Sequence, residues 1–128
     1  MDDEIEATLA EMSIEERAAA RVTGPGPYKV PLQFPVTAKI KVEGGSTREE
    51  TYDSVSIRRP GMKEITDSST IAEKKGNSAG LYWLAAQLTG LPEHVIHLMD
   101  PDDFAEVEAV IEVFMQKFQR GGKRNSVI

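Results

Sequence analysis

The chain has 128 residues and a mass of 14.1 kDa, the size of one domain. No apolar run approaches the roughly 20 residues that a membrane-spanning helix needs. The absence of cysteine excludes disulfides, thiolate metal sites and a cysteine nucleophile. The N-terminal sequence is acidic where a signal peptide would be basic and then apolar, so we expect the protein to act in a cytoplasm.

The charge is unevenly distributed along the chain. Twenty-one acidic and fifteen basic residues give a formal net charge of −6. Most of this excess lies in the first sixteen residues, and from Arg17 onward the chain is nearly neutral. Because nucleic-acid binding depends on clusters of Lys and Arg that neutralise phosphates, nucleic acid is not an expected partner.

Residues 1–22 are predicted to form an acidic helical arm. Ile5, Leu9 and Met12 recur at helical spacing, but three apolar contacts make a thin stripe. Ser13 and Glu16 have the spacing of a capping box, so the arm can also be two short helices. Two alternatives stay open: an arm that a partner orders, and a helix packed on its own domain.

The predicted domain boundary is residues 23–31. Three prolines and two glycines in this segment disfavour both a continuing helix and a central strand, so we interpret it as a linker. The core domain is expected to span residues 32–120, and residues 121–128 are expected to form a flexible tail.

A β-hairpin is predicted after the linker. Apolar residues alternate with polar ones as in a half-buried strand, at Phe34, Val36, Ala38, Ile40 and Val42. Pro35 suggests the start or the edge of that strand. Alternation resumes over Thr51–Arg59 after a glycine-containing turn, which completes the hairpin.

Helices are predicted from Pro60-Gly61 to the end of the core. A weak helix covers Met62–Lys75 and stops at Gly76, and an apolar helix built around Leu81 to Leu88 ends at Gly90. A further turn or two starts at Pro92. The fold class is therefore α+β, with a hairpin followed by three or four packed helices.

The last helix has the clearest local signals. Asp100 can cap its start, Pro101 suits its first position, and Asp102 and Asp103 complement the helix dipole. We expect this helix to span residues 101–119 and to end before a glycine pair. Its apolar stripe consists of Phe104, Val107, Ile111, Phe114 and Phe118.

No catalytic group of residues is apparent in the sequence. His94, His97 and Asp100 are residue types that could bind a metal, but the helix that would carry them is too short for such a site to be favoured. The serines lack the context of a nucleophile elbow, and no glycine-rich loop has phosphate-binding spacing. We therefore expect a protein without enzymatic activity and without a cofactor.

A binding protein is the reading that remains. The candidates for partner contact are also the candidates for the core, and the core interpretation is favoured for most of them; they are Trp83, Leu84, Leu88, Phe104, Ile111, Phe114 and Phe118. Met99 and Met115 could add an adaptable contact surface.

The order of the segments resembles a known family. A hairpin ending in Ile57-Arg-Arg-Pro60 is followed by a polar helix, by Leu84-Ala-Ala-Gln-Leu-Thr-Gly-Leu-Pro92 and by an Asp-Pro-Asp-Asp helix start. This order is similar to that of the small tail assembly chaperones of long-tailed bacteriophages. The residues that carry the resemblance are Arg58, Arg59, Pro60, Thr89, Gly90, Leu91, Pro92, Asp100 and Asp103. The acidic arm is longer than the pattern needs.

The resemblance implies a function in virus assembly. The protein would bind the long, largely helical tape-measure protein in the host cytoplasm, help to recruit tail-tube subunits and be absent from the mature virion. It implies neither catalysis nor a cofactor. A longer form made by ribosomal frameshifting near Gly121-Gly122-Lys123 and a homo-oligomer both stay open.

Two other functions are alternatives. A structural tail component, such as a terminator or connector subunit, would be found in purified particles. A small acidic adaptor or inhibitor of a host protein would use the segment Asp2–Glu16 to bind a basic partner, in a manner sensitive to salt.

Overall fold

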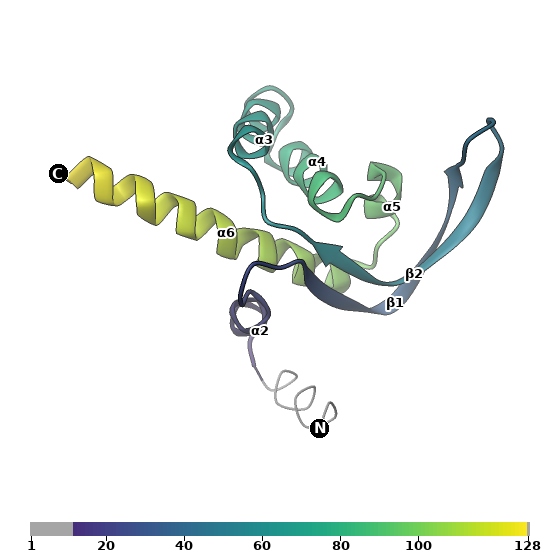
Figure 1. Ribbon diagram of the computed structural model, residues 1–128, viewed down its shortest axis with the longest axis horizontal. Coiled ribbons are helices and arrows are strands. Elements are labelled where there is room, and N and C mark those ends of the chain that lie inside the picture. The colour runs from purple at the N-terminus through teal and green to yellow at the C-terminus, as the bar shows by residue number, and fades with distance from the viewer. Residues whose placement is uncertain (1–11, 128) are drawn as a thin grey trace.

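The computed structural model describes the backbone of residues 12–127 and the side chains of residues 12–116 (Figure 1). Its elements, in chain order, are α2 (Ile14–Arg21), β1 (Tyr28–Lys41), β2 (Thr47–Ile57), α3 (Met62–Lys75), α4 (Asn77–Thr89), α5 (Glu93–His97) and α6 (Pro101–Val127). An antiparallel hairpin followed by packed helices is the α+β fold that the sequence predicts. Most of the predicted arm, residues 1–11, and the side chain of Phe118 lie outside the described residues.

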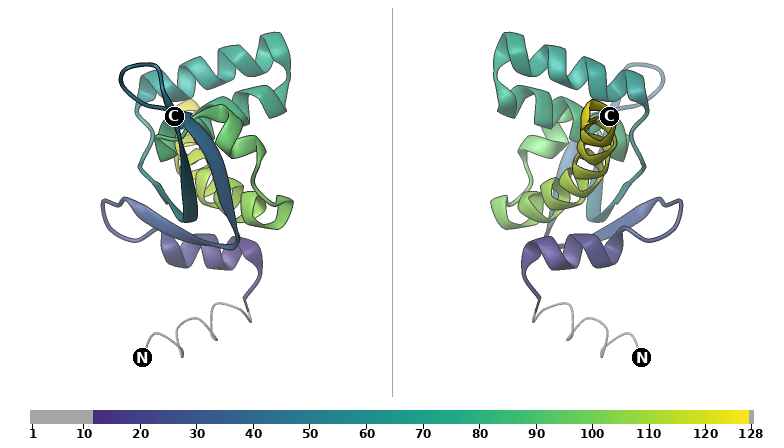
Figure 2. Two further views of the ribbon diagram at one scale, coloured as in Figure 1. Left: turned by 90° about the vertical axis from the view of Figure 1, so that its right-hand side faces the viewer. Right: turned by 90° about the vertical axis from the view of Figure 1, so that its left-hand side faces the viewer.

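The elements are arranged around α6. Helices α3 and α4 lie on one side of α6, and α2 lies on the opposite side (Figures 1 and 2). One end of the hairpin closes the core, with β1 against α6 and β2 against α4. The hairpin then bends and extends beyond the helices toward its turn (Figure 1).

The core is made by side chains from the hairpin and from the helices. The largest fully buried side chains come from both strands and from α4, α5 and α6; they are Val30, Ile57, Leu88, Val95, Val107, Val110 and Ile111. A two-stranded hairpin is marginally stable in water, so the helices that cover its apolar face stabilise it.

The hairpin starts earlier than the sequence predicts. Strand β1 begins at Tyr28, inside the predicted linker, and Tyr28 and Val30 are buried. Each strand of a two-stranded ribbon has one edge without a partner. Proline therefore removes no ladder hydrogen bond where its missing N–H faces that free edge.

A wide irregularity divides β1 into two halves. Pro31 is paired with Ser54 and Val36 with Tyr52, so four residues of β1 lie opposite one residue of β2. The extra residues interrupt the alternation, which leaves Phe34 56% exposed. The prediction that Phe34 lies on the buried face is therefore wrong, because a bulge redirects side chains that a regular strand would turn inward.

The helix boundaries follow the local signals closely. Helix α3 has the predicted bounds, and α4 ends at Gly90, whose φ of 73° places it in the left-handed region. Helix α6 begins at Pro101 as predicted but continues to Val127, past the glycine pair at which its end is predicted. Each glycine costs a helix about 1 kcal/mol relative to alanine, which weakens a helix without breaking it.

Helices α3 and α4 pack closely because of one glycine. A Cβ atom on Gly80 would lie 2.7 Å from the carbonyl oxygen of Ser68. The Ser68 hydroxyl donates a 3.1 Å hydrogen bond to the Gly80 carbonyl across the same contact. Only glycine allows the two backbones to approach this closely.

Across the residues that the structure describes, no helix combines the length and hydropathy that crossing a bilayer would require.

Candidate functional site

Helix α2 is held against α6 by one carboxylate. Glu106 accepts hydrogen bonds from Arg17 Nε at 2.9 Å and from Arg21 Nη1 at 2.7 Å. Burial favours a raised pKa for Glu106, but the hydrogen bonds from the two guanidinium groups outweigh it and hold the pKa below its ordinary value. Ala18 of α2 is completely buried in the contact.

The described part of the predicted arm is therefore a helix packed on its own domain. Its start is the predicted capping box, in which the Ser13 hydroxyl accepts from the Glu16 amide and the Glu16 carboxylate accepts from the Ser13 amide. The acidic residues of α2 that do not contact α6 face solvent.

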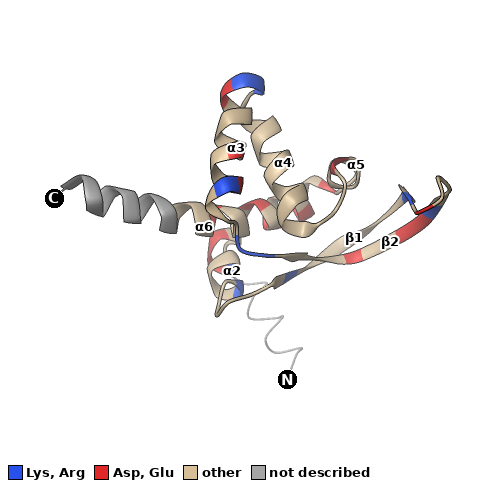
Figure 3. Cartoon of the chain, turned by 45° about the horizontal axis from the view of Figure 1, so that its top comes forward, with Lys and Arg blue, Asp and Glu red and all other residues tan. Residues whose placement is uncertain are grey.

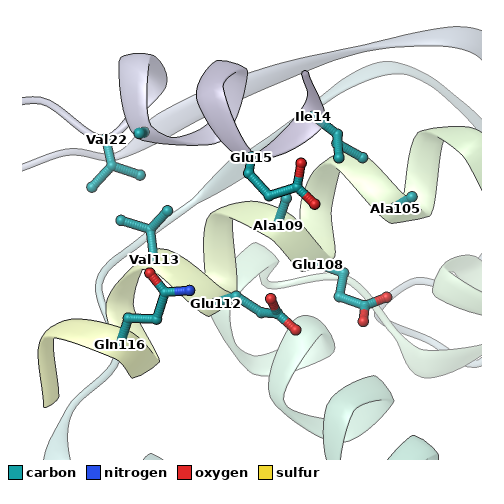
Figure 4. Close-up of a pocket in the computed structure, with 10 residues that line it drawn as sticks. Ile14, Glu15, Val22, Ala105, Glu108, Ala109, Glu112, Val113 and Gln116 are labelled. Carbon is teal, nitrogen blue, oxygen red and sulfur yellow. The ribbon is translucent and has the colours of Figure 1, made fainter. Parts of the chain in front are cut away.

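A groove of about 510 Å³ runs between α2 and α6 (Figure 4). Its floor is apolar, with small side chains at several positions, and its rim is polar and acidic. The apolar lining is Ile14, Ala19, Val22, Ala105, Ala109 and Val113. The rim consists of Glu15, Glu108, Glu112 and Gln116.

A second groove, of about 480 Å³, lies on the other side of α6, against α3 and α4. Its lining combines the apolar side chains of Leu81, Leu84, Ile111 and Met115 with the hydroxyl groups of Ser68 and Ser69. We refer to the two depressions as the α2–α6 groove and the α3–α4–α6 groove.

One row of side chains separates the two grooves. Glu108, Glu112 and Gln116 follow one another at intervals of four along α6, and all three line both grooves. Residues 101–116 of α6 include five acidic residues and no Lys or Arg (Figure 3). The surface is thus an acidic ridge flanked by two depressions that contain apolar side chains.

Asp103 fixes the irregular part of β1 to the start of α6. Asp103 is 2% exposed, and its carboxylate accepts from the Gln33 amide at 2.9 Å and from the Phe34 amide at 3.0 Å. The sequence predicts only a helix-dipole role for Asp103, whereas its hydrogen bonds in the structure are to the backbone of β1. Asp100 does cap the helix, since it accepts from the Asp102 amide at 2.9 Å.

The residues that carry the family resemblance form joints between elements. The Arg58 amide donates to the Leu88 carbonyl at 3.0 Å, which joins the end of β2 to the end of α4. Arg58 also forms an ion pair with Glu64, while Arg59 is exposed and Pro60 is half-buried.

The Thr-Gly-Leu-Pro segment makes the next joint. The Thr89 hydroxyl donates to the Ala85 carbonyl at 2.7 Å and accepts from the Leu91 amide at 3.3 Å. Gly90 then reverses the chain, and Pro92 stands at the N-cap of α5. The contacts of Arg58 and of the Thr-Gly-Leu-Pro segment therefore position β2, α4 and α5 relative to one another.

The two histidines have structural contacts. Nε2 of His94 lies 2.9 Å from the Lys39 carbonyl oxygen, which joins α5 to β1. The His97 ring lies 4.6 Å, between centroids, from the ring of Tyr82. Among the residues with described side chains, no three potential metal ligands gather into a group.

The predicted core and partner-binding candidates separate by burial. Leu84, Leu88, Ile111 and Phe114 are buried, and Phe114 packs on Tyr28 with ring centroids 5.5 Å apart. The half-buried candidates are Trp83 and Phe104. Of the two methionines, Met99 is buried and Met115 lines the α3–α4–α6 groove.

The α2–α6 groove is a feature that the sequence pattern indicates only weakly. The spacing of Ala105, Ala109 and Val113, four residues apart, marks a second apolar stripe on α6 beside the main one. Small residues make this stripe weak in hydropathy, and its α2 wall is distant in the chain.

A comparison with family models matches this chain to a known family. The model described as "Phage tail assembly chaperone proteins, E, or 41 or 14" matches residues 29–116. Searches among curated proteins and among solved structures found no significant match.

Proposed function

Because the chain belongs to the phage tail assembly chaperone family, we propose that it binds the tape-measure protein and helps to recruit tail-tube subunits while the tail is being assembled. The matched segment includes β1 from its second residue, β2 and helices α3, α4 and α5, together with α6 as far as Gln116.

The surface of α6 carries this proposal. A long helical client exposes an apolar stripe until the tail tube encloses it, and such a stripe needs a temporary apolar partner. The two grooves offer apolar contact without forming one large exposed apolar patch, because the acidic ridge between them stays solvated. The net charge of −6 would help to keep the complex soluble.

The proposed action is reversible binding without a chemical step. The protein would act in the host cytoplasm, release its client as the tube polymerises and be absent from the mature virion. Release of this kind requires moderate affinity, which suits shallow grooves better than a deep pocket.

Co-expression with the tape-measure protein of the same phage tests the proposal. We expect the tape-measure protein to be soluble and to co-purify with the tagged chain, and to aggregate when it is expressed alone. A tape-measure protein that is equally soluble without the chain and does not co-purify with it would contradict the proposal. So would detection of the chain at stoichiometric amounts in purified particles, as expected of a structural tail component.

A further inference from the structure

The α2–α6 groove differs from the other depression on α6 in ways that restrict what can bind there. Its apolar floor contains three alanines, Ala19, Ala105 and Ala109, so a partner backbone can approach closely. Its acidic residues come from both walls, Glu15 from α2 and Glu108 and Glu112 from α6. Figure 4 shows the carboxylates along an apolar strip.

The dimensions of the groove match a helix. Its α6 wall runs from Ala105 to Gln116, about 18 Å at 1.5 Å per residue, which is about three helical turns. Helices that pack side by side in this manner present residues at spacings of three and four to each other's grooves. An extended strand would leave its backbone polar groups without partners there, since the groove is formed by helical side chains.

The groove walls are fixed before a partner arrives. Arg17 and Arg21 hold α2 to Glu106, and Ala18 is buried beneath them. A preformed groove reduces the ordering cost of binding, which leaves more of the contact energy for affinity.

We infer that the α2–α6 groove is the docking site for an amphipathic helix of the tape-measure protein whose apolar stripe is flanked by Lys or Arg. The inference rests on the proposed function and adds the surface used and the chemistry of the client segment. The alanine-lined floor takes the apolar stripe, and the acidic rim on both walls pairs with the basic flanks.

Charge also argues against two other occupants. The segment of residues 1–11 holds five acidic residues and no base, so the acidic rim would repel it. The basic segment of a second copy, residues 117–128, holds Phe118 as the single apolar residue before Val127. Neither segment combines basic flanks with a continuous apolar stripe.

Two variants of the full chain test the groove directly. Ala109→Trp fills the floor of the α2–α6 groove. Ala20→Trp, the matched control, places the same side chain at an exposed position of α2 that lines neither groove. Both variants are checked by circular dichroism and thermal melting. We expect Ala109→Trp to lose at least tenfold in affinity for the tape-measure protein and Ala20→Trp to bind like the unchanged chain.

A charge reversal provides a second test of the groove, which is needed if the tryptophan of Ala109→Trp disturbs α2. Glu15→Lys changes the rim of the groove, and Glu73→Lys changes an exposed residue of α3 that lines neither groove. Exposed ion pairs contribute up to about 1 kcal/mol, so Glu15→Lys should weaken binding about twofold to fivefold. Glu73→Lys should have no effect.

A synthetic peptide separates the failure of this inference from the failure of the proposed function. The probe is an amphipathic helix of about 14 residues with Leu along one face and Lys on both flanks, compared with the same peptide carrying Glu in place of Lys. We expect the Lys peptide to bind and the Glu peptide not to bind, with binding that weakens from about 0.1 M to about 1 M salt.

Different results would contradict the groove inference and the proposed function. If Ala109→Trp and Glu15→Lys bind the tape-measure protein like the unchanged chain, the groove inference is wrong and the proposed function stands. If the unchanged chain binds no tape-measure protein but binds the Lys peptide through this groove, the proposed function is wrong and the helix site stands. Failure to bind the Lys peptide, or concentration-dependent self-association that Glu15→Lys abolishes, overturns the inference.

Discussion

Replacement of Asp103 tests the structural basis of the fold most sharply. Its buried carboxylate is the acceptor for two backbone amides of the irregular segment of β1. In Asp103→Asn the side chain keeps its size, but its amide nitrogen cannot accept a hydrogen bond, so one of the two backbone amides loses its partner. The negative charge, which strengthens the remaining bond and complements the helix dipole, is also lost.

The magnitude follows from these losses. A hydrogen bond to a charged group contributes about 1.5–3 kcal/mol, and a buried donor without a partner costs about 1–3 kcal/mol. The two figures are not fully additive, because both describe the loss of the same hydrogen bond. We therefore expect a destabilisation of about 2–4 kcal/mol. At roughly 4 °C per kcal/mol for a domain of this size, the melting temperature should fall by about 8–16 °C.

Thermal melting and amide hydrogen exchange measure the effect. Asp102→Asn is the matched control, because Asp102 lies in the same helical turn and is exposed. We expect Asp103→Asn to lose exchange protection at the Gln33 and Phe34 amides, while Asp102→Asn keeps it. If Asp103→Asn melts within about 0.5 kcal/mol of the unchanged chain, the size of a surface substitution, and keeps both amides protected, the reasoning is refuted.

Three further predictions concern helix packing. Gly80→Ala should destabilise the protein by about 1–3 kcal/mol in a denaturant titration, because the added Cβ meets the Ser68 carbonyl; a stabilisation would show that α3 yields easily. Phe114→Ala should cost about 3–5 kcal/mol in the same assay, since its ring is 6% exposed; a stable variant that only loses its partner would instead place Phe114 in an interface. Because the folded-state pKa of Glu106 is lowered, its stabilising effect is present above its unfolded pKa and is lost as the pH falls through the folded one. Acid should therefore loosen α2 in the unchanged chain, and Glu106→Gln should loosen it already at neutral pH, as measured by amide exchange in Ile14–Arg21.

The sequence predicts well what short segments determine. The bounds of α3, the left-handed Gly90 and the start of α6 at Pro101 depend on residues within one helical turn of each boundary. The capping box at Ser13 is local in the same way. Caps and glycines act through backbone conformation and nearby hydrogen bonds, so a pattern in the sequence is enough to place them.

Contacts between residues far apart in the chain cannot be predicted from such local patterns. Asp103 binds amides some seventy residues earlier in the chain, and that pairing decides that Phe34 faces outward. The α2–α6 groove exists because Arg17 and Arg21 reach Glu106, which no local spacing indicates. In both cases a charged side chain with a local explanation in the sequence has a non-local partner in the structure.

In the complex that we propose, α6 and α2 together receive a helix from a tail protein. Hydrogen–deuterium exchange of the chain, alone and in complex with the tape-measure protein, measures this directly. We predict slower exchange in Ile14–Arg21 and in residues 105–116 on complex formation, with little change at the hairpin turn of residues 42–46. Protection confined to the hairpin, with α2 and α6 exchanging as in the free chain, would contradict it.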